Sequence, residues 1–158
     1  MDASSKGEAP SAKALGLPPI DQVAYMVENL DEAIERFNPI FGPFTTMEAD
    51  NEGSLFRGEP HDVAMKIAFG RSGDLEVELI EHVEGESPHK DWIEQHGESI
   101  FHVRCKVEDV DARLAQMAKL GWEAIWYNDT MASIGIKYAY TQAPPAAGGH
   151  IIEFVQGF

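Results

Sequence analysis

Apolar residues recur along the chain with two different spacings, which predict strands in some segments and helices in others. Residues 20–27 (IDQVAYMV) form the first expected strand. After Asp31, the spacing in 33–42 is that of one helix face, and Gly42 supplies a stop. The apolar members of that face are Ala33, Ile34, Phe37 and Phe41. Pro39 is expected to shorten or kink this helix.

Further strands and a polar linker are expected before the sequence pattern begins again. The three strands are expected at 43–50, 62–70 and 75–83. A polar, glycine-containing loop should separate the first two, and the sequence GRSGD favours a tight turn before the third. Residues 84–97 are polar and contain Pro88 and Gly97, so we interpret them as a linker with one helical turn around Trp92.

The same order of elements then repeats. A strand at 99–107 precedes a helix at 112–121, which either Asp109 or Asp111 caps, and three more strands follow at 122–129, 133–142 and 150–158. Asp31 and Asp111 lie 80 positions apart, as do Gln22 and His102. A shared order at a fixed offset indicates internal duplication, although an unrepeated α+β sandwich could show it by chance.

The predicted fold is α+β, with two βαβββ modules that form a curved, cup-shaped mixed sheet around a central metal site. Neither small sheet could bury its apolar face alone, so the two should pair and enclose a cavity. The predicted parts are a flexible tail at 1–17, a first module at 18–83, a linker at 84–97 and a second module at 98–158.

Composition limits the partners. The formal net charge of −15 leaves no basic stripe for nucleic acid or anionic membranes. No apolar run is long enough to span a membrane, and residues 1–13 lack the apolar core of a signal peptide. The single cysteine, Cys105, excludes an internal disulfide and is typical of a reducing, cytoplasmic location. We expect it to be a small buried strand residue.

Four strands each carry a potential metal ligand within an otherwise apolar stretch. Alternation across a strand assigns each side chain to a face. The potential ligands are Gln22, Glu78, His102 and Glu153. Taken singly, each has an ordinary structural explanation; Glu78, for example, could pair with Arg104. Glu153 is the hardest to explain in this way, because a carboxylate within IIEFV is costly to bury unless it is paired or coordinates a metal.

Taken together, these oxygen and nitrogen donors predict one divalent metal ion. Zn²⁺, Mn²⁺, Co²⁺, Ni²⁺ and Fe²⁺ would each suit them. The other histidines, at positions 61, 82, 89, 96 and 150, lack a matching strand face and are expected at the surface. Arg104, two positions from His102, is a candidate anion clamp for substrate and equally a candidate partner of Glu76. Trp126 and Tyr138 are candidate aromatic walls of the substrate pocket.

Three segments carry a resemblance to a known family: IDQVAYMVENLDEAIERF, ESIFHVRCKVEDVD and GGHIIEFVQ. They resemble the vicinal oxygen chelate superfamily, which includes lactoylglutathione lyases, methylmalonyl-CoA epimerases, extradiol dioxygenases and antibiotic-resistance proteins. The resemblance extends from residue 17 to residue 158. It implies that metal ligands come from the first and last strands of each module, here Gln22, Glu78, His102 and Glu153.

This ligand set is similar to that of zinc-type lactoylglutathione lyases. Epimerases usually have His in the first position and Gln in the second, and the chain departs from them at both. Its length and its opening strand nevertheless look like those of an epimerase. The resemblance implies a metal-dependent isomerase or lyase that acts through an enolate on a small oxygen-chelating carbonyl substrate, with Glu153 as base and Glu78 as the alternative.

Two other functions are weighed against this one. An extradiol-type dioxygenase would need a second His where Gln22 stands. A non-enzymatic small-molecule binding or resistance protein would have little use for an intact ligand set. A homodimer is also expected, with the strands at 20–27 and 100–107 as candidates for a shared sheet edge.

Overall fold

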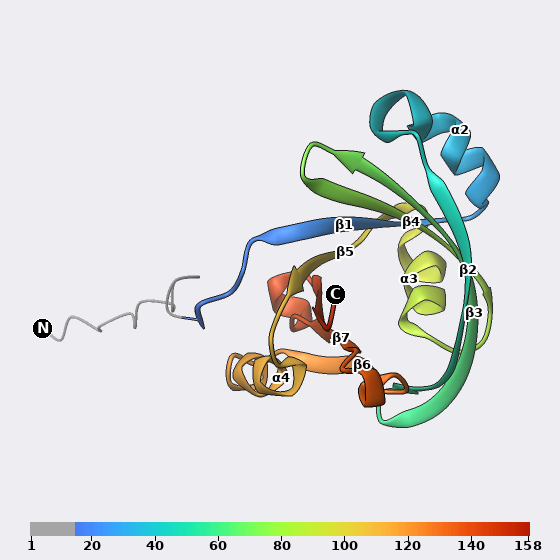
Figure 1. Cartoon of the computed structure of the whole chain (residues 1–158). Helices are drawn as coiled ribbons and strands as arrows, with labels where there is room; N and C mark the ends of the chain where they lie inside the picture. Colours follow the sequence, from blue (N-terminus) through green and yellow to red (C-terminus); the bar gives the residue numbers. More distant parts are fainter. Residues whose placement is uncertain (1–14) are drawn as a thin grey trace, which may run out of the picture.

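Eight strands and three α-helices are described between residues 20 and 156. The computed structural model of the protein describes residues 15–158 (Figure 1). The strands are β1 Ile20–Val27, β2 Thr45–Phe56, β3 Glu59–Ser72, β4 Leu75–Glu84, β5 Ser99–Lys106, β6 Glu123–Asn128, β7 Lys137–Gln142 and β8 Ile151–Gln156. The helices are α2 Leu30–Phe41, α3 Pro88–His96 and α4 Val110–Lys119, with short 3-10 turns at Ala132–Ile134 and Pro145–Ala147. A strand, a helix and three strands thus occur twice, with α3 between the two sets.

The strands form one closed barrel. Their order around it is β1-β4-β3-β2-β6-β7-β8-β5. The first strand of each set lies beside the fourth strand of the same set and pairs with it in parallel. The two sets join where β1 pairs with β5 and β2 with β6. The expected cup-shaped sheet is therefore corrected to a closed one, because these two contacts leave no open edge. The division into modules stays a prediction, since one continuous sheet includes both sets.

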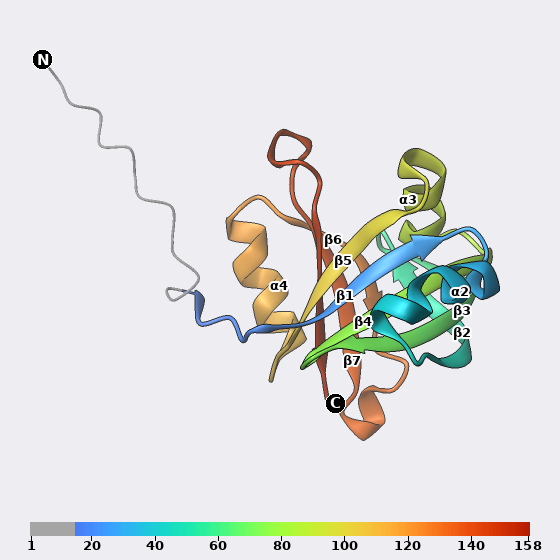
Figure 2. The same cartoon turned by 90° about the horizontal axis from the view of Figure 1, so that it is seen from above.

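Buried apolar residues form three clusters. Inside the barrel, Met26, Phe101 and Trp126 belong to one cluster. Helix α2 covers the outer face of β3 and β4, and α4 covers the outer face of β5, β7 and β8. Helix α3 lies at one end of the barrel, where Trp92 and Ile93 pack against the inner cluster (Figure 2). The inside of the barrel is therefore filled at the α3 end.

The helix boundaries follow from capping side chains. Asn29 caps the N-terminus of α2. Its Oδ1 accepts a hydrogen bond from the Glu32 N–H at 3.0 Å. Asp109 caps α4 in the same way, accepting from the Ala112 N–H at 3.0 Å, which decides between the two expected caps. Pro39 lies inside α2 and does not end the helix, which continues to Phe41.

The prediction of a loop between residues 50 and 62 is wrong. Strands β2 and β3 extend through it and meet at a two-residue turn, where Arg57 and Gly58 have φ values of 50° and 84°. Two positive φ values suit the right-handed twist of a hairpin. Polarity alone favoured a loop, but much of this hairpin is exposed and tolerates polar side chains. Conversely, the strand expected from residue 133 begins only at Lys137, after a 3-10 turn.

The linker is also more ordered than predicted. Instead of one turn, it contains the nine-residue helix α3. The Oγ of Ser87 accepts from the Lys90 N–H at 3.2 Å, and Pro88 occupies the first turn, where no intrahelical N–H is needed. The tail predicted at residues 1–17 is described only in its last part. Residues 1–14 lie outside the described part, whereas the carbonyls of Leu15 and Gly16 accept hydrogen bonds from Arg113.

The strands expected to supply a dimer edge have no free edge. Within the chain, β1 pairs with β4 and β5, and β5 pairs with β1 and β8. That part of the dimer expectation is wrong, because a strand with two neighbours cannot add a third. Dimerisation itself stays a prediction. Among the described helices, none combines the length and the apolar character that crossing a membrane requires.

Candidate metal centre

Two rows of side chains cross four neighbouring strands on the inside of the barrel. The register places Gln22 on β1 opposite both Glu76 on β4 and Arg104 on β5, and Arg104 opposite Glu153 on β8. Two residues further along β1, Ala24 lies between Glu78 on β4 and His102 on β5. Because alternate residues of a strand share a face, both rows point into the barrel. The small side chain of Ala24 leaves room between its larger neighbours.

The four predicted ligands meet at the Nε2 atom of His102. This nitrogen lies 2.9 Å from Gln22 Oε1, 3.0 Å from Glu153 Oε2 and 3.6 Å from Glu78 Oε2. All four residues are at most 8% exposed. Donor atoms that share one divalent ion, with bonds of about 2.0–2.2 Å, lie roughly 3 Å apart. The structure therefore brings the four residues that the sequence predicted as ligands together around one ring nitrogen. That they bind a metal ion stays a prediction.

The chemistry of these donors suits a cation. One ring nitrogen carries at most one proton, so it can satisfy only one of the three oxygens around it. Burial raises the pKa of the Glu78 carboxyl well above its ordinary value, and the nearby charge of Glu153 raises it further. A divalent ion would use all four lone pairs and relieve the repulsion between the two carboxylates.

The predicted ligand set includes an amide as well as a histidine and two carboxylates. Within residues 15–158, no group of three or more His, Cys, Asp and Glu side chains is arranged to hold a metal ion. His102, Glu78 and Glu153 are therefore not a complete site by themselves. The predicted set adds the amide oxygen of Gln22, 2.9 Å from His102 Nε2, and its metal binding stays a prediction.

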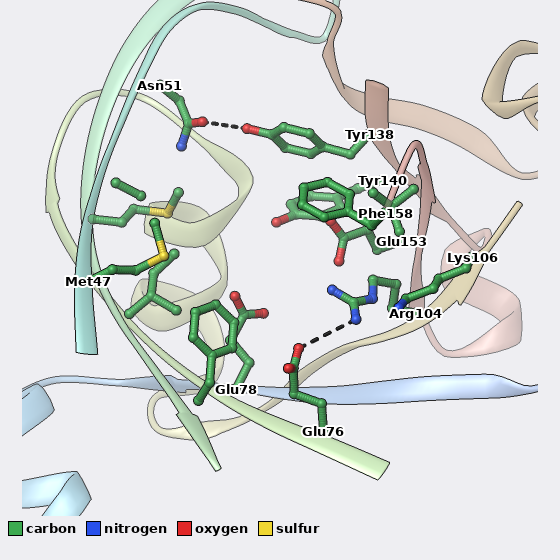
Figure 3. Close-up of a pocket in the computed structure, with 15 residues that line it drawn as sticks. Met47, Asn51, Glu76, Glu78, Arg104, Lys106, Tyr138, Tyr140, Glu153 and Phe158 are labelled. Carbon is green, nitrogen blue, oxygen red and sulfur yellow. Dashed lines mark hydrogen bonds and ion pairs between the residues drawn. The ribbon is translucent and has the colours of Figure 1, made fainter. Parts of the chain in front are cut away.

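Two of the four donors, Glu78 and Glu153, line a cavity of about 460 Å³ inside the barrel. Glu78 and Glu153 reach into it from opposite sides, one from β4 and the other from β8 (Figure 3). One wall is apolar and comes from β2 and β3. Its members are Met47, Ala49, Met65, Ile67 and Phe69. The cavity can thus hold a small molecule that has polar atoms at one end and an apolar group at the other.

Arg104 lines the cavity but is already paired with carboxylates. Its Nε and Nη2 lie 3.0 Å and 2.8 Å from the two carboxylate oxygens of Asp21, and Nη2 lies 3.4 Å from Glu76 Oε1. Burial alone would raise the pKa of Asp21, but its hydrogen bond with Arg104 holds that pKa below its ordinary value. Of the two roles considered for Arg104, the pairing with Glu76 is the one that these contacts support.

The two aromatic candidates lie in different places. Tyr138 lines the cavity, and its hydroxyl donates to Asn51 Oδ1 (Figure 3). Trp126 does not line it. Only 1% exposed, Trp126 stacks behind Tyr140, with the two ring centroids 6.3 Å apart. Trp126 therefore lies behind the cavity wall, of which Tyr140 is a part.

His89 corrects the expectation that the remaining histidines lie at the surface. It is 0% exposed, and its Nε2 lies 3.0 Å from the hydroxyl of Tyr140. Burial lowers the pKa of His89 well below its ordinary value, so the ring is neutral. Strand parity could not find it, because His89 lies on a helix. The spacing of His89, Trp92 and Ile93 in the linker, which is that of one helix face, could have shown it.

Replacing His89 with Ala is expected to destabilise the protein by about 2–4 kcal/mol. The change leaves a cavity beside Phe101 and Trp126, whose ring centroids lie 5.0 Å and 5.6 Å from that of His89, and removes the partner of the Tyr140 hydroxyl. Urea unfolding measures the effect. His96→Ala, an exposed position on the same helix, is the matched control and should cost less than about 1 kcal/mol. Equal losses in the two variants would contradict the buried role of His89.

The family is identified by sequence. The profile of the Glyoxalase/Bleomycin resistance protein/Dioxygenase superfamily matches residues 21–140, which include three of the four clustered donors. The chain belongs to this superfamily. The resemblance noted in the sequence is thereby confirmed. Members of this superfamily commonly bind a divalent metal ion, and they include both enzymes and proteins without enzymatic activity. A search of curated proteins finds no match.

Solved structures support the fold. A hypothetical protein from Bacillus halodurans C-125 is 22% identical, with a TM-score of 0.60 over 89% of this chain and 94% of that one. Methylmalonyl-CoA epimerase from Mycobacterium tuberculosis is 20% identical, with a TM-score of 0.61 over 90% and 89%. A Streptomyces coelicolor methylmalonyl-CoA epimerase variant in complex with 2-nitronate-propionyl-CoA is 21% identical, with a TM-score of 0.57 over 89% and 98%. At these identities the likeness concerns the fold.

Proposed function

We propose that the protein is a metal-dependent isomerase or lyase that acts through an enolate on a small carbonyl substrate. The observation that carries this proposal is the convergence of Gln22 Oε1, His102 Nε2 and the carboxylates of Glu78 and Glu153 beside one cavity. In this proposal these four side chains hold one divalent ion. When bound, the ion would supply Lewis-acid chemistry, polarising a carbonyl group and stabilising negative charge on its oxygen.

The chain's own residues would carry the proton transfers. Glu153 is proposed as the base that removes a proton from the carbon next to the carbonyl, with Glu78 as the alternative. The two carboxylates enter the cavity from opposite sides (Figure 3), so each can reach a different face of a substrate between them. That arrangement supports a reaction in which one carboxylate removes a proton and the other, or the same one, returns it elsewhere.

The cavity also restricts the substrate. Its apolar wall favours a carbonyl compound with an aliphatic or aromatic substituent, which would displace water on binding. The hydroxyl of Tyr138 and the amide of Asn51, which are hydrogen-bonded to each other, offer polar contacts away from the four donors. Methylmalonyl-CoA epimerases among the structural neighbours are isomerases, which supports an isomerase reaction without naming the substrate of this chain.

Two measurements test the proposal together. Elemental analysis after reconstitution with Zn²⁺, Mn²⁺, Co²⁺, Ni²⁺ or Fe²⁺ should give one metal per chain. A panel of thiohemiacetals, acyl-CoA epimers and hydroxyketones in deuterium oxide should then include a compound whose acidic hydrogen exchanges only with the loaded protein. Absence of metal would contradict the site. One metal per chain with ligand binding but no exchange across the panel would favour a non-enzymatic binding protein instead.

A further inference from the structure

The side chain of Gln22 must be oriented correctly to serve the metal centre. Its amide carries one oxygen and one NH₂ group of nearly equal size, so packing alone does not decide which end faces His102. Only the oxygen can bind a metal ion. The NH₂ group is attracted to carboxylates, and Glu78 and Glu153 lie on the His102 side. With nothing to oppose this attraction, the amide would turn its NH₂ group toward the site.

Glu76 provides the opposing contact. Gln22 Nε2 donates to Glu76 Oε1 at 2.8 Å, while Gln22 Oε1 lies 2.9 Å from His102 Nε2. An ionised carboxylate only accepts hydrogen bonds, so it selects the NH₂ end of the amide. The register places Glu76 directly beside Gln22 on the neighbouring parallel strand, away from His102.

Glu76 is itself held in place from a third strand. Arg104 Nη2 lies 3.4 Å from the same Oε1 atom of Glu76, and Asp21 fixes the guanidinium with two hydrogen bonds. The side chains of Arg104, Glu76 and Asp21 are 15%, 25% and 26% exposed, so solvent screens this chain of contacts only in part. These contacts hold the Glu76 carboxylate where its Oε1 accepts from the Gln22 NH₂ group.

From these contacts we infer that Glu76, supported by Arg104 and Asp21, is a positioning residue that locks the Gln22 amide with its oxygen toward the metal centre. The inference rests on the proposed metal site, because it concerns the way in which one of its ligands is presented. It assigns Glu76 a role that differs from those of Glu78 and Glu153, since Glu76 would act through Gln22 and not on the metal or substrate.

The first test uses the metal-free protein. The side-chain NH₂ signals of Gln22 are identified in a ¹⁵N–¹H spectrum by their loss in Gln22→Glu. In the parent protein they should exchange slowly with water, since Gln22 is 1% exposed and bonded to Glu76. In Glu76→Met, which keeps the chain length but removes the acceptor, they should shift and exchange faster. Unchanged signals would overturn the inference whether or not the protein binds a metal.

The second test is a double-mutant cycle read by Co²⁺ affinity, measured in competition with a coloured chelator. Glu76→Met should weaken Co²⁺ binding by about 10–100-fold in the parent, which is typical for residues that orient a metal ligand. In a Gln22→Glu background the same change should cost less than about 3-fold, because a carboxylate presents an oxygen in either orientation. A general effect of the Glu76 charge would appear equally in both backgrounds and would overturn the inference.

Two controls complete the design. Glu84→Met replaces an exposed glutamate on the same strand and should leave Co²⁺ affinity unchanged. If Glu76→Met does not fold, Glu76→Gln takes its place in both tests; it keeps an acceptor oxygen without the charge and should give a smaller loss of the same kind. Failure of the parent itself to bind Co²⁺ would contradict the proposed metal site, while the spectrum of Gln22 would still decide the orientation of its amide.

Discussion

Glu153→Gln is expected to slow exchange of the substrate's acidic hydrogen with solvent deuterium by about 10²–10⁴-fold, the usual contribution of a general base. The variant keeps an oxygen at the place where Glu153 Oε2 lies 3.0 Å from His102 Nε2, so metal binding should fall far less than exchange. An amide cannot accept the proton at neutral pH, and that is why the two properties should separate. Exchange is followed by NMR on the best substrate of the panel, and the metal content by elemental analysis.

The matched variant is Glu78→Gln. It makes the same chemical change on the other side of the cavity, on β4 instead of β8. If Glu153 is the base, Glu78→Gln should affect exchange less than Glu153→Gln does. If Glu78→Gln has the larger effect, the roles are reversed. Exchange at the parent rate in both variants, with metal still bound, would show that neither carboxylate is the base.

His102→Ala is expected to weaken metal binding by more than about 100-fold, since even residues that only orient a ligand contribute 10–100-fold. The Nε2 atom is the one that lies near all three of the other donors. Without it, two carboxylates and an amide remain, of which Glu78 already has a raised pKa because of its burial and the charge of Glu153. Competition with a coloured chelator measures the loss.

The control for this variant is His150→Ala, which removes an exposed histidine outside the cluster. It should bind metal as the parent does. Circular dichroism of both metal-free proteins separates a lost ligand from a lost fold. A folded His102→Ala protein with parental metal affinity would contradict the assignment of the four donors.

Local geometry explains which parts of the site could be predicted from the sequence. Side chains alternate across a strand regardless of the strand's neighbours, so parity placed Gln22, Glu78, His102 and Glu153 on faces within apolar strands. The first strand, 20–27, was predicted with its observed bounds. Parity also indicated that Arg104 shares a face with His102, but it left open whether Arg104 meets a substrate or Glu76.

Other features depended on contacts between distant segments. His89 was assigned to the surface because a polar linker gives no sign of the barrel end that α3 covers, where Phe101 and Trp126 surround the ring. The exposed β2–β3 hairpin was predicted as a loop, because polar residues suit both a loop and an exposed strand.

The sequence by itself thus determined which residue types lie on which faces of the strands, and it carried the family resemblance. Only the tertiary structure decided that the sheet closes, which strands are neighbours, and in what register they pair. The reason is that alternation belongs to a single strand, whereas register belongs to two strands far apart in the chain. That register is what places Glu76 and Arg104 beside Gln22, and the pairing of β1 with β5 is what brings Glu78 on β4 and Glu153 on β8 to the same histidine.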